Sequence, residues 1–220
     1  MVCGAEIMSK RLSDPLGGFA ENPASKHNLA EPIQPGLDPL SRFLLDSLVQ
    51  GTRLRQRNGI SYLTLRRWRT GVIQYQIDVL RSLKQNPPSL LVNAIADEIV
   101  GALDVALGLK ACKLVVPIPC SRSSSETCLS ILLAEKVAAK LRLPAVRALS
   151  ADPAEGKSHP MANLNRPPMR LVVPVDTTVL LVDDVATSGA HIEEATRLLR
   201  PVAGSVLSIA WIGGNDSGEG

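Results

Sequence analysis

Two adjacent acids followed by a turn of small residues are the part of this sequence best suited to chemistry. Asp183 and Asp184 follow four apolar residues, and Thr187, Ser188 and Gly189 come shortly after them. Carboxylates placed in this way accept hydrogen bonds from vicinal sugar hydroxyls or help to position Mg²⁺. A turn of small residues points successive backbone N–H groups at one anion, and a following helix adds its dipole. The spacing predicts a site that binds a phosphate and sugar hydroxyls together.

The elements that must position this turn alternate between strands and helices. Such alternation predicts an α/β fold with a parallel sheet and right-handed crossovers. In such sheets, ligands bind at the carboxyl ends of the strands, where the acids stand. Apolar runs predict strands over 113–119, 145–149, 169–175, 178–182 and 206–212, and periodic spacing predicts helices over 129–141 and 192–199.

The chain before this α/β region has a different pattern. Residues 1–38 mix Pro, Gly, Ser, Asn and charge without a period, which predicts a flexible N-terminal arm. Residues 39–109 predict a helical region, with apolar spacing of three or four over 61–83 and again from Ser89. We therefore divide the chain into this arm, the helical region, an α/β domain over 110–212 and a disordered tail over 213–220.

Composition excludes several classes of protein. The chain has 220 residues, 45% of them apolar but only six aromatic, which suits a layered α/β core of aliphatic side chains. No apolar run reaches the length of about 18 residues that a membrane span needs. The first ten residues lack the apolar segment of a signal peptide. We expect a soluble, cytoplasmic protein without a membrane partner.

The four cysteines show no spacing typical of a metal site. Cys3, Cys112, Cys120 and Cys128 form no Cys-x-x-Cys pair and have no histidine cluster nearby. Neither a structural zinc site nor a disulfide framework is expected from this pattern. We expect reduced thiols, some of them buried.

The twelve residues from Val179 to Ala190 resemble a known signature. Val-Leu-Leu-Val-Asp-Asp-Val-Ala-Thr-Ser-Gly-Ala is similar to the phosphoribosyl pyrophosphate signature of type I phosphoribosyltransferases. The resemblance extends over about residues 110–212 and looks closest to the competence ComF type. It implies a parallel-sheet type I phosphoribosyltransferase core, here preceded by a helical N-terminal region. Ala190 departs from the pattern, because many members of the family have Thr or Ser there.

The resemblance also implies roles for individual residues. The two acids would face the ribose, with Mg²⁺ accompanying the phosphoribosyl pyrophosphate, and the turn would hold the 5′-phosphate. Residues 119–124 would form a pyrophosphate loop, in which Arg122 meets the diphosphate as a bidentate cation. A loop over 152–166 would supply a further cation. The catalytic residues implied are Asp183, Asp184 and Arg122, with the two acids also as metal ligands, and the binding residues are Val185, Ala186, Thr187, Ser188, Gly189, Ala190, Cys120, Ser121, Ser123, Lys157 and Arg166.

Two functions remain open at this point. The first is an enzyme that transfers the phosphoribosyl group to a nitrogen acceptor such as a nucleobase. The second is a non-catalytic or regulatory module that binds phosphoribosyl pyrophosphate or a nucleotide and acts with a partner, for example in a defence system. Between Gly51 and Lys84 there are seven arginines and one lysine against one acid, so this region is a candidate surface for nucleic acid or a protein. A homodimer is also compatible with the sequence.

Overall fold

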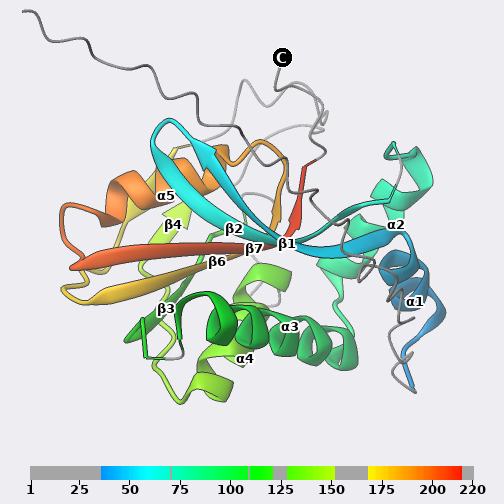
Figure 1. The fold of residues 1–220 in the computed structure, drawn as a ribbon, viewed down its shortest axis with the longest axis horizontal. Helices are drawn as coiled ribbons and strands as arrows, with labels where there is room; N and C mark the ends of the chain where they lie inside the picture. The colour runs from blue at the N-terminus through cyan, green and yellow to red at the C-terminus, as the bar shows by residue number, and fades with distance from the viewer. Residues whose placement is uncertain (1–35, 70, 109, 121–127, 152–167, 215–220) are drawn as a thin grey trace, which may run out of the picture. The chain divides into compact units, whose positions relative to one another are not determined.

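The computed structural model describes residues 36–69, 71–108, 110–120, 128–151 and 168–214. From Gly36 onward, these residues belong to one compact unit. Its centre is a mixed sheet with helices on both faces (Figure 1). No helix within the described ranges is both long and apolar enough to cross a membrane.

In the part of the chain that the structure describes, the central sheet has five strands in the order β1-β2-β7-β6-β3. β2, β7, β6 and β3 run parallel to one another, and β1 pairs with β2 as an antiparallel hairpin at the edge. A second small sheet pairs β4 with β5. The strands are β1 (Leu48–Arg57), β2 (Ile60–Trp68), β3 (Leu114–Pro117), β4 (Leu149–Ala151), β5 (Met169–Leu171), β6 (Thr178–Ala186) and β7 (Ser205–Gly213).

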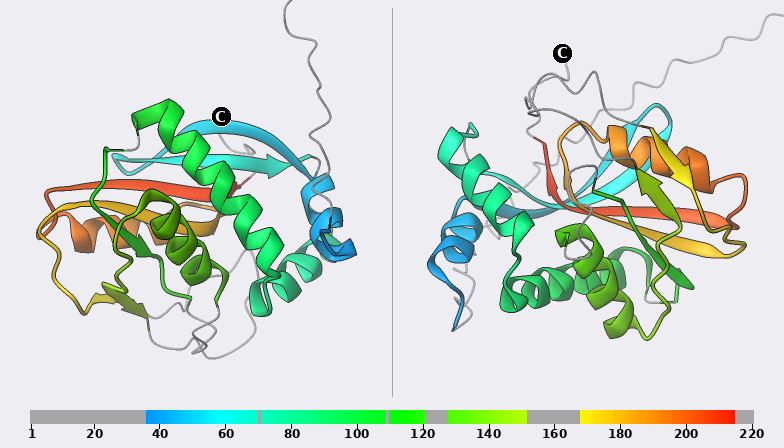
Figure 2. Two further views of the ribbon diagram at one scale, coloured as in Figure 1. Left: turned by 90° about the horizontal axis from the view of Figure 1, so that it is seen from below. Right: turned by 180° about the vertical axis from the view of Figure 1, so that it is seen from behind.

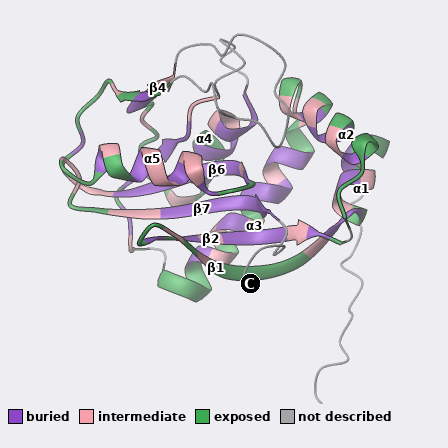
Figure 3. Ribbon diagram, turned by 90° about the horizontal axis from the view of Figure 1, so that it is seen from above, coloured by how far each residue is buried: buried purple, intermediate pink, exposed green. Residues whose placement is uncertain are grey.

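Within the described residues, five helices cover the two faces of the sheet. They are α1 (Pro39–Asp46), α2 (Gln74–Gln85), α3 (Ser89–Leu107), α4 (Leu129–Leu141) and α5 (Ala190–Leu199). Residues of the first four helices share one buried cluster, whereas α5, β4 and β5 pack in a second cluster on the other face (Figure 2). β6 is buried on both faces, because Leu180 and Val182 belong to the first cluster and Val179 and Leu181 to the second (Figure 3). Because β6 lies between β7 and β3 and is covered on both faces, it is a firm support for the residues at its end.

The α/β prediction is confirmed where the pattern was strongest. The predicted strand over 113–119 contains β3, the predicted helix over 129–141 is α4, and the predicted strand over 206–212 lies within β7. β6 continues to Ala186, four residues beyond the predicted end, because its last residues still pair with β7. Residues 1–35, the 152–166 loop and most of the tail lie outside the described residues.

The helix predicted over 61–83 is wrong in its first half. Residues 60–68 form β2, and a helix begins only at Gln74. Asn58 and Gly59 have positive φ angles of 47° and 76°, which is the conformation of a tight hairpin turn. β2 then pairs with β7, so the region 39–109 contributes a strand to the same sheet as the signature. Tertiary pairing therefore overrides a spacing that also fits a helix.

The expectation of reduced thiols is wrong for two of the cysteines. Cys120 and Cys128 form a disulfide, whereas Cys112 is a free, buried thiol. Their Cα atoms lie 6.6 Å apart because the end of β3 and the start of α4 meet at this point. The Ser130 hydroxyl donates to the Ile118 carbonyl at 2.7 Å and holds the two segments together. Proximity in space, which the spacing of the cysteines does not show, creates this pair.

Candidate functional site

The acid pair lies near the carboxyl end of β6. Asp183 is paired with Ala210 of β7, and only 4% of Asp183 and 2% of Asp184 is exposed. On the other side of β6, the Ile118 N–H donates to the Val182 carbonyl at 2.9 Å. The chain therefore leaves β3 next to the acids. Two carboxylates are thus buried at the point where a parallel sheet commonly binds its ligand.

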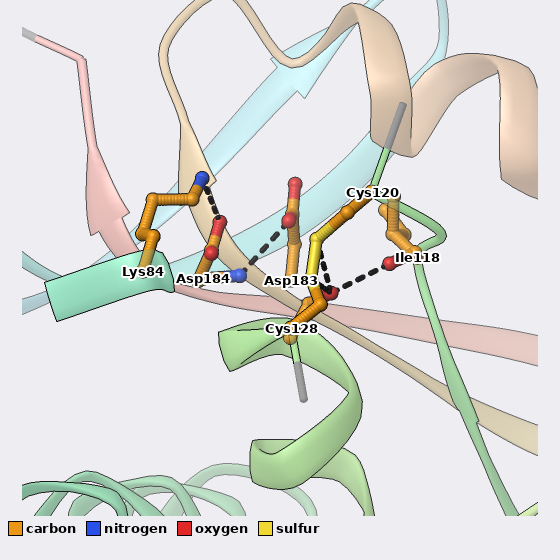
Figure 4. A network of polar contacts seen from close by, with 7 residues as sticks. Lys84, Ile118, Cys120, Cys128, Asp183 and Asp184 are labelled. Atoms are coloured by element: carbon orange, nitrogen blue, oxygen red, sulfur yellow. Dashed lines mark hydrogen bonds and ion pairs between the residues drawn. A yellow bond between two sulfur atoms is a disulfide. The ribbon is translucent and has the colours of Figure 1, made fainter. Parts of the chain in front are cut away.

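One oxygen of each carboxylate is engaged and the other is not. The Asp184 N–H donates to Asp183 Oδ1 at 2.8 Å, and Lys84 Nζ lies 2.8 Å from Asp184 Oδ1 (Figure 4). Asp183 Oδ2 and Asp184 Oδ2 are buried and accept no hydrogen bond from the described residues. Buried carboxylate oxygens without a donor are costly, so their retention at this site points to a ligand that supplies donors.

The environment of Asp183 favours its protonated form. Burial, followed by the charge of Asp184, raises the pKa of Asp183 to about 8, and Lys84 opposes this rise. At neutral pH Asp183 therefore favours its protonated form, which lowers the cost of burying it beside a second acid. A protonated Asp183 can donate as well as accept a hydrogen bond.

The turn after the acids opens into a pocket. The pocket has a volume of about 270 Å³ and is formed by residues 185–191 together with Glu194. Gly189 has a φ of 70° and lies immediately before α5. A helix start without a side chain at its cap leaves backbone N–H groups available to an anion. The turn thus lines a pocket at a helix start, and its role in phosphate binding stays a prediction.

The β1–β2 hairpin secures this turn. Arg57 donates to the Ser188 carbonyl at 3.0 Å and also pairs with Glu193 of α5 at 2.6 Å. Asn58 donates to the same glutamate at 2.9 Å. The Tyr62 ring packs against Gly189 so closely that a Cβ there would lie 2.5 Å from its hydroxyl oxygen. The backbone shape of the turn is therefore held by a part of the chain that the sequence pattern assigned to the helical region 39–109.

The predicted binding residues divide into two groups. The structure brings Asp183, Asp184 and residues 185–190 together at the end of β6. Cys120 lies where β3 ends, and its sulfur is bonded to Cys128, as Figure 4 shows. The other predicted residues lie outside the described residues, and their roles stay predictions: Ser121, Arg122, Ser123, Lys157 and Arg166.

Several residues of the site have no sequence signal. Lys84, Arg57 and Tyr62 precede Asp184 by 100 residues or more, and only the fold brings them to the signature. His191 and Glu194 also line the pocket. Both could have been chosen from the sequence, because they directly follow the predicted turn on the first part of α5.

The acid pair fits Mg²⁺ only together with a ligand. No group of three His, Cys, Asp or Glu side chains among the described residues is arranged to hold a metal ion. Mg²⁺ requires six oxygen ligands, and Asp183 and Asp184 offer one open oxygen each. The pair would thus hold an ion whose remaining ligands come from the phosphorylated sugar and water.

Many basic side chains between Gly51 and Lys84 have partners within the fold. Arg66 pairs with Glu98 through two hydrogen bonds of 2.8 and 2.7 Å, and Arg55 donates to the Gly214 carbonyl at 2.6 Å. Arg81 pairs with Asp78. These contacts explain much of the basic composition without a nucleic acid.

Comparisons with known proteins give a likeness of structure and none of sequence. No protein-family model and no curated protein matches the chain. The chain is similar to the crystal structure of adenine phosphoribosyltransferase from Saccharomyces cerevisiae, with 17% identity, a TM-score of 0.43, and coverage of 79% of this chain and 88% of that one. It is also similar to adenine phosphoribosyltransferase from Leishmania tarentolae, with 14% identity, a TM-score of 0.40, and coverage of 80% of this chain and 88% of that one. A third similar structure is orotate phosphoribosyltransferase from Aeropyrum pernix, with 16% identity, a TM-score of 0.34, and coverage of 77% of this chain and 79% of that one. Because these identities and TM-scores are low, any functional assignment rests on the acid pair and the turn themselves.

Proposed function

We propose that this chain is a phosphoribosyltransferase-like protein that binds Mg²⁺-phosphoribosyl pyrophosphate at the end of β6. The turn over 186–190 would hold the 5′-phosphate, and Asp183 and Asp184 would hold the ribose hydroxyls. The diphosphate would lie toward residues 120–124, where the chain leaves β3. The likeness of the 179–190 stretch and of the element order to ComF-type proteins supports this assignment.

One observation carries the proposal. Two buried carboxylate oxygens without a hydrogen-bond donor stand directly before a turn that opens into a pocket at a helix start. Vicinal hydroxyls and a phosphate on one ribose are complementary to this pair of features. Neither feature alone distinguishes a ligand, but together they fit a sugar that carries both hydroxyls and a phosphate.

The reaction we propose is a displacement at the ribose C1 carbon. A nitrogen of the acceptor forms a bond to C1 while the bond between C1 and the diphosphate oxygen breaks. The diphosphate leaves with the bonding electrons, and the acceptor nitrogen then loses its proton to solvent. The protein's residues would act by holding the ribose and its phosphate in position. Mg²⁺, when bound with the ligand, would neutralise part of the diphosphate charge.

Calorimetry with phosphoribosyl pyrophosphate and Mg²⁺ tests the binding site. Wild type should bind one equivalent, and the double change Asp183→Asn/Asp184→Asn should abolish binding while leaving the protein folded. Absence of binding to well-folded wild type would refute the proposal. Release of diphosphate with an acceptor such as a nucleobase would then establish catalysis.

A regulatory module is the alternative that the same site permits. Such a protein would bind the ligand without releasing diphosphate, and would act through a nucleic-acid or protein partner. The internal partners of Arg55, Arg66 and Arg81 favour the first function over one that uses the basic region. Nucleic-acid binding that weakens steeply with salt would favour the alternative.

A further inference from the structure

Among the described residues, Lys84 is the cation that forms an ion pair with Asp184 of the acid pair, and it comes from a helix distant in sequence. It stands in the last turn of α2, and its ammonium lies 2.8 Å from Asp184 Oδ1. The carboxylate is 3% exposed, whereas the lysine side chain is 35% exposed. Figure 4 shows the lysine reaching the acid from the side of α2. The lysine side of the pair is therefore partly open to solvent.

This contact determines which ligands the acids can accept. A buried carboxylate attracts a cation strongly because the local dielectric constant is low. Lys84 already supplies that charge, so a free divalent cation approaching Asp184 would meet a positive group beside it. The two open oxygens, Asp183 Oδ2 and Asp184 Oδ2, carry no such competitor and can accept hydrogen bonds from neutral hydroxyls.

We infer that Lys84 is the resident cation of the acid pair and makes the pair selective for sugar hydroxyls over free divalent metal. A metal ion then enters the site only with a phosphorylated sugar, which brings the additional oxygen ligands. Lys84 is in this sense a specificity-determining residue. The inference deepens the proposed function and rests on it for the identity of the sugar.

A purely structural role for Lys84 makes a different prediction. If the lysine only fastened α2 to the sheet, its removal would lower stability and leave metal affinity unchanged. Metal binding by the protein alone therefore separates the two roles. It requires neither catalysis nor phosphoribosyl pyrophosphate.

The experiment measures Mn²⁺ binding at pH 8 without sugar, by electron paramagnetic resonance and calorimetry. We expect Lys84→Met to bind Mn²⁺ at least about tenfold more tightly than wild type, because a unit charge next to the acids is removed. Lys84→Arg keeps the charge and should bind as weakly as wild type. Arg81→Met, one turn earlier on α2, removes a charge that pairs with Asp78 at the surface and is the matched control.

Two results would overturn the inference. The first is an unchanged Mn²⁺ affinity in folded Lys84→Met. The second needs no variant of the lysine: sub-millimolar Mn²⁺ binding by wild type that is lost in Asp184→Asn. If instead the Mn²⁺ results are as expected but wild type fails to bind phosphoribosyl pyrophosphate, the role of Lys84 stands and the proposed function falls.

Discussion

The two halves of the candidate site are held in place by different kinds of interaction. The turn over 186–190 is held from the hairpin side by the Arg57 contact to the Ser188 carbonyl and by the Tyr62 ring against Gly189. The acid pair is buried in the sheet, and among the described residues its ion pair is with Lys84. The turn therefore depends on backbone shape, and the acid pair depends on charge. Steric changes should damage the first, and changes of charge or pH the second.

The largest effect on the hairpin side should come from Glu98→Ala. Glu98 accepts two hydrogen bonds from Arg66 of β2 and one of 3.1 Å from the Trp211 indole N–H. Arg66 is 5% exposed, so the change removes two charge-assisted hydrogen bonds from a buried guanidinium. We expect unfolding free energy to fall by about 3 kcal/mol, measured by urea denaturation. A loss below about 1 kcal/mol would contradict the view that this pair anchors the hairpin.

Gly189→Ala should be the next most damaging change. The residue has a φ of 70°, and a Cβ would lie 2.5 Å from the Tyr62 hydroxyl oxygen and 2.8 Å from the Cζ carbon. We expect a loss of about 2 kcal/mol or more in stability, together with loss of phosphate binding in calorimetry.

Gly59→Ala is the matched control for this change. Gly59 has a φ of 76°, but a Cβ there would meet nothing within 4 Å. Gly59→Ala should lower the free energy of unfolding by only about 1 kcal/mol and leave phosphate binding intact. Equal losses in the two variants would show that Tyr62 does not constrain the turn.

The acid pair should make the free energy of unfolding depend on pH. The pKa of Asp183 is about 8 in the folded protein and near 3.8 in the unfolded chain. Between these values the folded state holds a proton that the unfolded state has lost. Stability from this group therefore falls as the pH rises from about 4 to 8, by at most about 1.4 kcal/mol per pH unit, and levels off above 8.

Asp183→Asn should remove that fall, as followed by urea denaturation across the same pH range. Asp104→Asn, which changes an exposed acid on α3, should keep the wild-type profile. Parallel profiles for Asp183→Asn and wild type would contradict the assignment of the slope to Asp183.

The smallest effect should come from Arg57→Ala. Arg57 is 41% exposed, so its pair with Glu193 is weak, and its contact with the turn is a single hydrogen bond. We expect the binding free energy of a phosphorylated sugar to weaken by about 0.5 kcal/mol, which is roughly a twofold loss in affinity. Arg197→Ala removes another pair with Glu193 without touching the turn and should leave affinity unchanged. Equal affinities for the two variants would show that the hairpin does not support the turn.

The sequence predicted the β6–α5 half of the fold because local features there agree with one another. An apolar run ends in two acids, and small residues precede the next helix, so strand, turn and helix follow directly. The hairpin half was mispredicted because Tyr62, Leu65 and Trp68 fit a helical spacing as well as a strand buried on both faces. Asn58-Gly59 was the signal that could have distinguished the two.

Contacts between distant parts of the chain could not be predicted. Lys84 is 100 residues from Asp184, and nothing in either segment indicates the other. The Cys120–Cys128 disulfide likewise depends on the meeting of β3 and α4 and not on a spacing typical of such pairs. The acids and the turn were thus accessible to sequence reasoning, whereas the groups that tune them required the fold.

Titration of the protein with ribose 5-phosphate tests the central claim most directly. This ligand carries only the phosphate and hydroxyls that the turn and the acid pair are proposed to bind, without the diphosphate. We expect wild type to bind it, Gly189→Ala and Asp183→Asn/Asp184→Asn each to lose most of that affinity, and Gly59→Ala to match wild type. Failure of folded wild type to bind, or binding that neither change weakens, would contradict the claim that one phosphorylated ribose spans both halves of the site.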